Sequence, residues 1–166
     1  MRIPTGGRSV ALIAEATTPS QISSAEELIR EYAASLGIDL GFQNFELEMA
    51  EFPRAYARPD GRILIAVEGG DAVGVVGLRK LSGEICEMKR MYVRPRFRQR
   101  GIGRMLAERA IGEAQDIGYK RMRLDTLSRL REAVSLYDSL GFKKIGPYTV
   151  NPQEDVVYME LDLGKL

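Results

Sequence analysis

The residues best suited to chemistry lie in one short stretch, from Arg98 to Arg104, which contains Gly101 and Gly103. Glycine at these positions lets a ligand approach the backbone without meeting a Cβ atom. The stretch follows a predicted strand and opens a predicted helix. The first amides of a helix have no partner within it and lie at the positive end of its dipole. The stretch therefore predicts a site for an anion such as phosphate.

The charge around this stretch agrees with an anion site. No acidic residue occurs between Glu87 and Glu108, and seven cationic residues lie close to the glycines: Lys89, Arg90, Arg94, Arg96, Arg98, Arg100 and Arg104. The alternative is a turn that needs glycine, surrounded by solvated arginines. A dinucleotide-binding loop would require a third glycine where Leu106 stands, and no Gly-Lys-Ser/Thr follows that would complete a phosphate-binding loop of the Walker type.

Composition narrows the possible chemistry. The 166 residues contain 24 lysines and arginines against 23 acidic residues, so a net charge of +1 gives no drive toward nucleic acid or an anionic membrane. The chain contains no histidine, which excludes a Ser-His-Asp or Cys-His catalytic system. Cys86 is its one cysteine, which excludes an intrachain disulfide and a metal site built from several cysteines. We expect no metal cofactor. The early apolar run Val10–Ala14 is too short for a membrane span or signal core, which predicts a soluble, cytoplasmic protein.

The elements that position the stretch follow from hydrophobic periodicity. We expect one domain over residues 1–166, with strands and helices in the order β-α-α-β-β-β-α-β-α-β-β. Helices are predicted from the capping serines Ser23 and Ser24 to Gly37, over 44–52, over 102–117 and from Ser128 to Gly141. Strands are predicted over 10–15, 62–68, 72–79, 85–93, 121–127, 142–145 and 156–163. The fold class is α+β, with one mixed sheet carrying helices on its faces.

Two motifs in this order resemble the GNAT N-acetyltransferase superfamily. Arg98-x-x-Gly101-x-Gly103 after a strand is similar to the family's acyl-CoA pyrophosphate loop, Arg/Gln-x-x-Gly-x-Gly/Ala. The segment 133–142, with Tyr137 before Leu-Gly-Phe, is similar to its second signature. The resemblance implies a mostly antiparallel sheet of six to seven strands, splayed in the middle and flanked by about four helices. It also implies transfer of an acetyl group from acetyl-CoA to an amine by direct attack in a ternary complex.

The resemblance also implies which residues bind acetyl-CoA. The backbone of the strand end would hold the thioester arm, and the loop would hold the pyrophosphate, with further contacts from the strand and helix beyond. The residues carried over are Met91, Tyr92, Val93, Arg98, Gln99, Arg100, Gly101, Ile102, Gly103, Arg104, Thr126, Ala133 and Tyr137. One position departs from the pattern. Many members carry a cofactor-contacting asparagine where this chain has Leu130, and the neighbouring Arg131 is a candidate replacement.

Two residues are predicted to act in catalysis. The family's tyrosine sits near the sulfur, which makes Tyr137 the candidate general acid for the leaving thiolate; the alternative is an ordinary core aromatic. Glu87 lies eleven residues before Arg98, where some members place a general base. For Glu87 the alternative is a salt bridge to Lys89 or Arg90. Cys86 is expected on the opposite sheet face as a small buried residue rather than an acyl-carrying nucleophile.

The residues that would bind the acceptor amine are predicted from the family resemblance and not from a motif. The family's acceptor lies between the first helices and the last hairpin, which points to Phe42, Gln43, Phe45, Tyr56 and the segment Tyr148–Pro152 with Asn151. Asp125 and Thr126 either border this site or satisfy loop amides. Residues 1–52 carry eight acidic residues and three arginines. This excess predicts either a wall that favours a cationic amine or simply the wet face of a helix.

Two functions from different classes remain in competition. The first is an N-acetyltransferase that acetylates the primary amine of a small molecule or peptide. The second is a non-catalytic acyl-CoA-binding regulatory module, which the leucine at position 130 favours. A homodimer is possible by analogy with similar proteins. Nucleic-acid binding through the arginines is disfavoured by the near-zero total charge.

Overall fold

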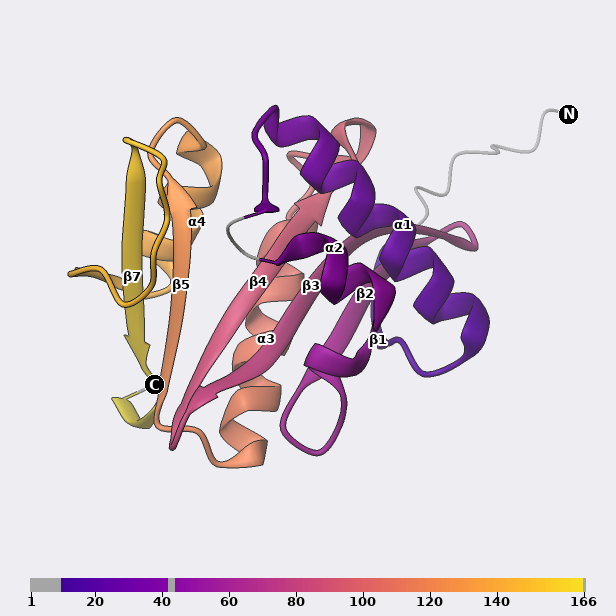
Figure 1. Cartoon of the computed structure of the whole chain (residues 1–166). Helices are drawn as coiled ribbons and strands as arrows, with labels where there is room; N and C mark the ends of the chain where they lie inside the picture. The colour runs from indigo at the N-terminus through magenta and orange to yellow at the C-terminus, as the bar shows by residue number, and fades with distance from the viewer. Residues whose placement is uncertain (1–9, 42–43, 166) are drawn as a thin grey trace, which may run out of the picture.

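The computed structural model describes residues 10–41 and 44–165, which form one seven-stranded mixed sheet flanked by four α-helices (Figure 1). The sheet order is β1-β2-β3-β4-β5-β7-β6. The strands are β1 (Leu12–Glu15), β2 (Arg62–Glu68), β3 (Asp71–Ser82), β4 (Ile85–Val93), β5 (Arg121–Leu127), β6 (Lys143–Ile145) and β7 (Val156–Asp162). The helices are α1 (Pro19–Leu36), α2 (Phe45–Ala50), α3 (Ile102–Ile117) and α4 (Arg131–Ser139). The predicted α+β class and element order are confirmed.

Helices cover both faces of the sheet and divide the core in two. The helices α1 and α2 lie over one face, where Leu28 and Ile29 pack against β2 and β3, while α3 and α4 lie over the other, where Leu106 and Ala110 are buried (Figure 1). Because β2 and β3 are covered on both sides, their sequences are continuous apolar runs rather than alternating ones. No helix within the described residues is long and apolar enough to cross a membrane.

The sheet opens at its centre, between β4 and β5. These two strands are parallel and pair only where Ile85–Glu87 lies beside Arg121–Arg123. On its other side β4 stays paired with β3 as far as Val93, and β5 stays paired with β7 as far as Leu127. The two strands therefore diverge toward their carboxyl ends (Figure 1), and a hollow lined by residues of both strands lies between them, in what we call the crevice. The splayed middle strands implied by the family resemblance are confirmed.

Two helix starts differ from the sequence prediction. The first helix begins at Pro19, where Thr18 and Gln21 form the capping box, instead of at Ser23 and Ser24. Proline fits the first helical position because its fixed φ and missing N–H suit it. The helix α4 begins after Leu130 rather than at Ser128, whose amide donates to the carbonyl of Asp155. The predicted capping serines therefore lie near these helix starts, but none of them caps a helix with its side chain.

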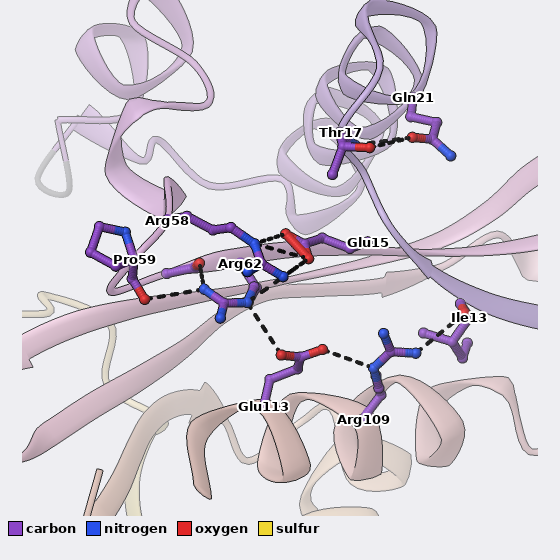
Figure 2. A network of polar contacts seen from close by, with 10 residues as sticks. Ile13, Glu15, Thr17, Gln21, Arg58, Pro59, Arg62, Arg109 and Glu113 are labelled. Carbon is purple, nitrogen blue, oxygen red and sulfur yellow. Dashed lines mark hydrogen bonds and ion pairs between the residues drawn. The ribbon is translucent and has the colours of Figure 1, made fainter. Parts of the chain in front are cut away.

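A network of ion pairs joins the first two strands to α3 (Figure 2). Arg62 of β2 is almost fully buried, and its Nε lies 3.2 Å from Oε2 of Glu113 on α3. Arg62 also donates to the carbonyls of Pro59 and Gly61. Glu15 of β1 accepts from Nε of Arg58 at 2.8 Å. Arg109 of α3 donates to the carbonyl of Ile13 in β1, so β1 is bonded to α3 as well as paired with β2 at the edge of the sheet.

This network predicts an acid-sensitive contribution to stability. The hydrogen bond from Arg58 lowers the pKa of Glu15 below its ordinary value of 4.5. A lowered carboxyl pKa stabilises the folded state above pH 4.5, and this stabilisation is lost as pH falls through the folded-state value. We expect Glu15→Gln to lower the melting temperature at pH 7 by about 2–4 °C. The difference from wild type should shrink progressively as pH falls below 4.5, as measured by calorimetry at a series of pH values.

A matched change on the exposed face of α1 provides the control. Glu26 pairs with Arg30 one turn away, and the two side chains are 35% and 48% exposed, well above the 16% of Glu15. Pairs of this kind contribute little, so Glu26→Gln should leave the melting temperature nearly unchanged at every pH. A Glu15→Gln penalty that persisted undiminished at pH 3 would contradict the electrostatic explanation.

Candidate active site

The crevice begins at a β-bulge in β4. Gly77 of β3 pairs with Lys89 and Val75 pairs with Tyr92, so β4 has two residues where β3 has one. The first bulged residue, Arg90, has a φ of 61°, a left-handed conformation that is rare for a side chain of its size. A bulge bends its strand and disrupts regular pairing, so it adds to the divergence of β4 from β5 beyond Glu87, the last residue of β4 that pairs with β5.

The side chain of Arg90 fixes the bulge from the α2 side. Its Nε lies 3.1 Å from Oε2 of Glu48, and its guanidinium lies 5.2 Å from the ring centroid of Phe45. Both charged side chains are nearly fully buried. Glu48 also accepts from the hydroxyl of Tyr56 at 3.0 Å. This cluster holds the strained residue in place and turns the next residue, Met91, toward the crevice.

Two adjoining hollows occupy the crevice. The first, which we call the deep pocket, has a volume of about 70 Å³ and lies between α1, β4, β5 and α4. The second, the long cleft, has a volume of about 1030 Å³ and extends past the end of β4 to the start of α3. Six residues line both: Tyr32, Leu36, Met91, Leu130, Ala133 and Tyr137. A ligand in the cleft and a second one in the pocket would therefore meet at this shared wall.

The predicted anion loop lies at one end of the long cleft. Arg98, Gln99, Gly101, Ile102, Gly103 and Arg104 line it, together with Met91, Tyr92 and Val93 of the strand end. The N-cap of α3 is Gly101 with a φ of 79°, and no side chain caps the helix. The amides of its first turn therefore remain free for a ligand. Arginine side chains and these amides give the end of the cleft the character of an anion site.

The arginines contribute less charge to the cleft than the sequence suggested. Arg98 has no carboxylate partner among the described residues; its Nε donates to the carbonyl of Val93 at 2.9 Å. Arg100 lies outside both hollows and pairs with Glu68 at 3.1 Å. Three others are also engaged with carboxylates, namely Arg90 with Glu48, Arg94 with Glu31 and Arg104 with Glu108. Of the seven predicted cations, Arg98 and Arg104 line the long cleft.

Tyr137 projects from α4 to the wall between the two hollows. The residue is 5% exposed, and its ring packs against Phe142 with centroids 5.7 Å apart. Its hydroxyl has no hydrogen-bond partner among the described residues, and no fully buried polar side-chain atom there lacks one. The hydroxyl must therefore face the open space. Burial raises the pKa of Tyr137, so the phenol keeps its proton and can act as a donor.

Glu87 has a different environment from the one expected of a general base. It is 1% exposed and lines neither hollow. One carboxylate oxygen accepts from Arg79 at 2.8 Å, and the other accepts from the hydroxyl of Tyr148 at 2.6 Å. The alternative predicted from sequence, a salt bridge to Lys89 or Arg90, is wrong in its partner because Arg79 on β3 takes that place. Both carboxylate oxygens therefore already accept a hydrogen bond from within the protein.

The remaining predicted residues divide between the hollows and the core. Asp125 and Thr126 line the deep pocket, and Asp125 accepts from the amide of Asn151 at 3.1 Å. Tyr56 is instead buried in the core, with its ring against Gly77, and lines neither hollow. Tyr148 serves as the partner of Glu87. Phe42 and Gln43 lie outside the described residues.

Cys86 belongs to the core, as expected. It lies on the α3 side of the sheet, and its thiol donates to the carbonyl of Arg121 at 3.4 Å. Burial raises the pKa of the thiol to about 12. A thiol that stays protonated is a poor nucleophile, so Cys86 is a packing residue.

Sequence reasoning missed the contribution of α1 to the site. Tyr32 and Leu36 line both hollows and Ser35 lines the long cleft. Tyr32 and Leu36 lie within the predicted first helix, where apolar residues at helical spacing indicate burial but no ligand. Arg129 and Arg131 line the cleft beside the apolar Leu130. Arg131 therefore lies in the same hollow as Leu130, and its role as a replacement for the asparagine stays a prediction.

The comparisons with known proteins agree with this geometry. Residues 25–142 match the acetyltransferase (GNAT) family. The chain is 42% identical over 149 residues to an uncharacterized N-acetyltransferase of Schizosaccharomyces pombe, covering 89% of this chain and 91% of that one. It is 33% identical over 123 residues to the uncharacterized N-acetyltransferase YjgM of Escherichia coli, covering 71% and 74%. The chain therefore belongs to the GNAT family of N-acetyltransferases, which confirms the predicted enzyme class.

Solved structures show the same fold. A GNAT-family acetyltransferase from Staphylococcus aureus superposes with a TM-score of 0.75 at 20% identity, covering 93% of this chain and 99% of that one. A putative acetyltransferase from Salmonella typhimurium, solved with its cofactor acetyl-CoA, gives a TM-score of 0.66 at 22% identity over 92% and 94%. At these identities the likeness concerns the fold.

Proposed function

We propose that this protein transfers the acetyl group of acetyl-CoA to the primary amine of a small molecule or peptide by direct attack within a ternary complex. The observation that carries the proposal is the unpartnered hydroxyl of Tyr137 at the wall shared by the long cleft and the deep pocket. A proton donor at the junction of two adjoining ligand sites is what acyl transfer to an amine requires.

The residues present fit acetyl-CoA in the long cleft. The uncapped first turn of α3 and the side chain of Arg98 would hold the pyrophosphate. The backbone of Met91 and its neighbours, turned toward the crevice by the bulge, would polarise the acyl carbonyl. Preorganised donors aimed at an oxygen on which charge develops lower the barrier to acyl transfer. Ala133 and Thr126 would border the thioester end of the ligand.

Acetyl transfer would then proceed in three steps. The neutral amine in the deep pocket forms a C–N bond to the acyl carbon and gives one proton to water. The C–S bond breaks, and Tyr137 donates its phenolic proton to the departing thiolate. Water returns a proton to Tyr137, and the products are the acetylated amine and coenzyme A.

For Glu87 we propose a positioning role instead of a general-base role. Its carboxylate accepts hydrogen bonds from Arg79 of β3 and from Tyr148, which lies between β6 and β7, and it lines neither hollow in which the amine would bind. We expect Glu87→Gln to lower the free energy of unfolding by about 1–3 kcal/mol, since it leaves Arg79 without its anion. The pH–rate profile should keep its shape. Urea denaturation and steady-state rates between pH 6 and 9 measure the two effects.

The matched control for Glu87 is Glu84, an exposed residue in the turn before β4. Glu84→Gln should change neither stability nor rate. Disappearance of an ionisation from the acidic side of the Glu87→Gln profile, with stability unchanged, would restore the general base.

A second candidate function is a non-catalytic acyl-CoA-binding regulatory module. Leu130 supports it, because an apolar side chain stands where many members carry an asparagine that contacts the cofactor. One experiment separates the two functions: release of free thiol from acetyl-CoA in the presence of an amine panel, run beside thermal shift with acetyl-CoA. Acceptor-dependent thiol release supports the transferase. Stabilisation by acetyl-CoA without such release supports the module.

A further inference from the structure

The deep pocket contains a buried cation that the acetyl-transfer scheme does not use. Lys89 of β4 is 8% exposed and lines the deep pocket. Its ammonium makes no hydrogen bond or ion pair with any described residue. Since no fully buried polar side-chain atom in the described part of the chain lacks a partner, the ammonium must reach the pocket's open space.

The other charged groups around Lys89 each have a hydrogen-bond or ion-pair partner within the protein. Glu87 is held by Arg79 and Tyr148, and Arg90 is paired with Glu48. Asp125, on the facing strand β5, accepts from Asn151 and lies more than 4.0 Å from the Lys89 ammonium, too far for an ion pair. The pocket therefore presents a cation on one wall and a carboxylate on the other, which do not contact each other.

The separation of these two charges indicates what would fill the space. Burying an ammonium without a counterion is costly, and burial lowers the pKa of Lys89. An anion beside Lys89 would remove that cost. A ligand with an amine close to a carboxylate would place its carboxylate at Lys89 and its amine near Asp125, since both residues line the deep pocket. Leu36, Ile38 and Leu40 give the pocket an apolar surface for the rest of the ligand.

We infer that the acceptor is an amine that carries a carboxylate, such as a free amino acid with an apolar side chain, and that Lys89 binds this carboxylate. The inference rests on the proposed transferase function, because it assigns the acceptor of that same site. It replaces the cationic acceptor that the acidic residues 1–52 suggested. Two of those carboxylates, Glu31 and Glu48, are paired with Arg94 and Arg90 rather than facing the pocket.

The test uses acceptors that differ only in the carboxylate. Leucine, leucinamide and 3-methylbutylamine form one matched set, and phenylalanine, phenylalaninamide and phenethylamine form another. We expect kcat/KM for thiol release to favour the carboxylate member of a set by about 10- to 100-fold. In Lys89→Met this preference should fall to within about twofold, and in Lys89→Arg most of it should remain. Lys144→Met, a change at an exposed lysine of β6, should keep the wild-type preference.

A second readout separates this inference from the proposed function. Calorimetric titration of leucine and leucinamide into the protein with bound coenzyme A, which has no acetyl group to transfer, measures acceptor binding without turnover. Selective loss of leucine binding in Lys89→Met supports the inference even if no amine releases thiol from acetyl-CoA, a result that would contradict only the transferase. Equal preference in wild type and Lys89→Met, or no preference for the carboxylate in either readout, overturns the inference.

Discussion

Gly103→Asp is expected to weaken acetyl-CoA binding by about 100-fold while leaving the fold intact. A carboxylate in the first turn of α3 would lie beside the pyrophosphate, and like charges about 6 Å apart repel by roughly 3 kcal/mol at an effective dielectric constant of 20. The same carboxylate is favourable for the helix itself, because acidic residues stabilise a helix N-terminus. A Cβ at Gly103 would lie 3.6 Å from Leu136, an ordinary contact. Isothermal titration with acetyl-CoA and thermal unfolding measure both effects.

Two controls separate charge from bulk in this experiment. Gly103→Asn adds a side chain of the same shape without charge and should weaken binding by less than about tenfold. Gly112→Asp places the same charge later in α3, where an added Cβ meets nothing within 4 Å, and should leave binding unchanged. Equal losses from Gly103→Asp and Gly103→Asn would show that space, and not the anion site, accounts for the effect.

Tyr137→Phe is expected to lower kcat by about 100-fold or more while the Kd for acetyl-CoA stays within about twofold. The change removes the hydroxyl and keeps the ring that packs against Phe142. Because that hydroxyl has no protein partner in the described structure, its removal should not lower stability. Thiol release at saturating acceptor, thermal unfolding and titration with acetyl-CoA give the three quantities.

Tyr119→Phe is the matched control for the loss of a buried phenol. The hydroxyl of Tyr119 donates to the carbonyl of Asp60 at 2.7 Å and lies outside both hollows. Its removal should lower stability by about 1 kcal/mol and leave kcat unchanged. If Tyr137→Phe kept full turnover with an accepted amine, the leaving thiolate would take its proton from elsewhere.

Much of the sheet could be predicted from sequence because the apolar runs and turn residues that define its strands are local features of the chain. The bounds of β2, β4, β5 and α3 agree with the prediction to the residue, since apolar runs and flanking glycines mark both ends. The start of α1 was misplaced because several capping residues compete there, and Pro19 decides between them. The start of α4 carries no side-chain cap at all. Its position depends on packing against β5, which local sequence does not encode.

The candidate site could be predicted only where its residues form a motif. The loop from Arg98 to Arg104 and Tyr137 lie within such motifs, and all of these except Arg100 line the hollows. The surroundings of Glu87 could not be predicted, because its partners come from β3 and from Tyr148, 61 residues away. Tyr56 was predicted to contact the acceptor, but its ring is buried against Gly77 of β3, a contact between segments that the sequence does not reveal. Which charges are neutralised depends on contacts between segments distant in sequence.

The short pairing of β4 with β5 has a consequence for how such a protein can change over evolutionary time. Three residue pairs join the two halves of the sheet, and the outer edges of both strands are held by their other neighbours. The side chains that face the crevice beyond Glu87 therefore contribute little to sheet pairing. Substitutions among them can alter which acceptor fits without dismantling the architecture, so the specificity of this site is separable from the stability of its scaffold.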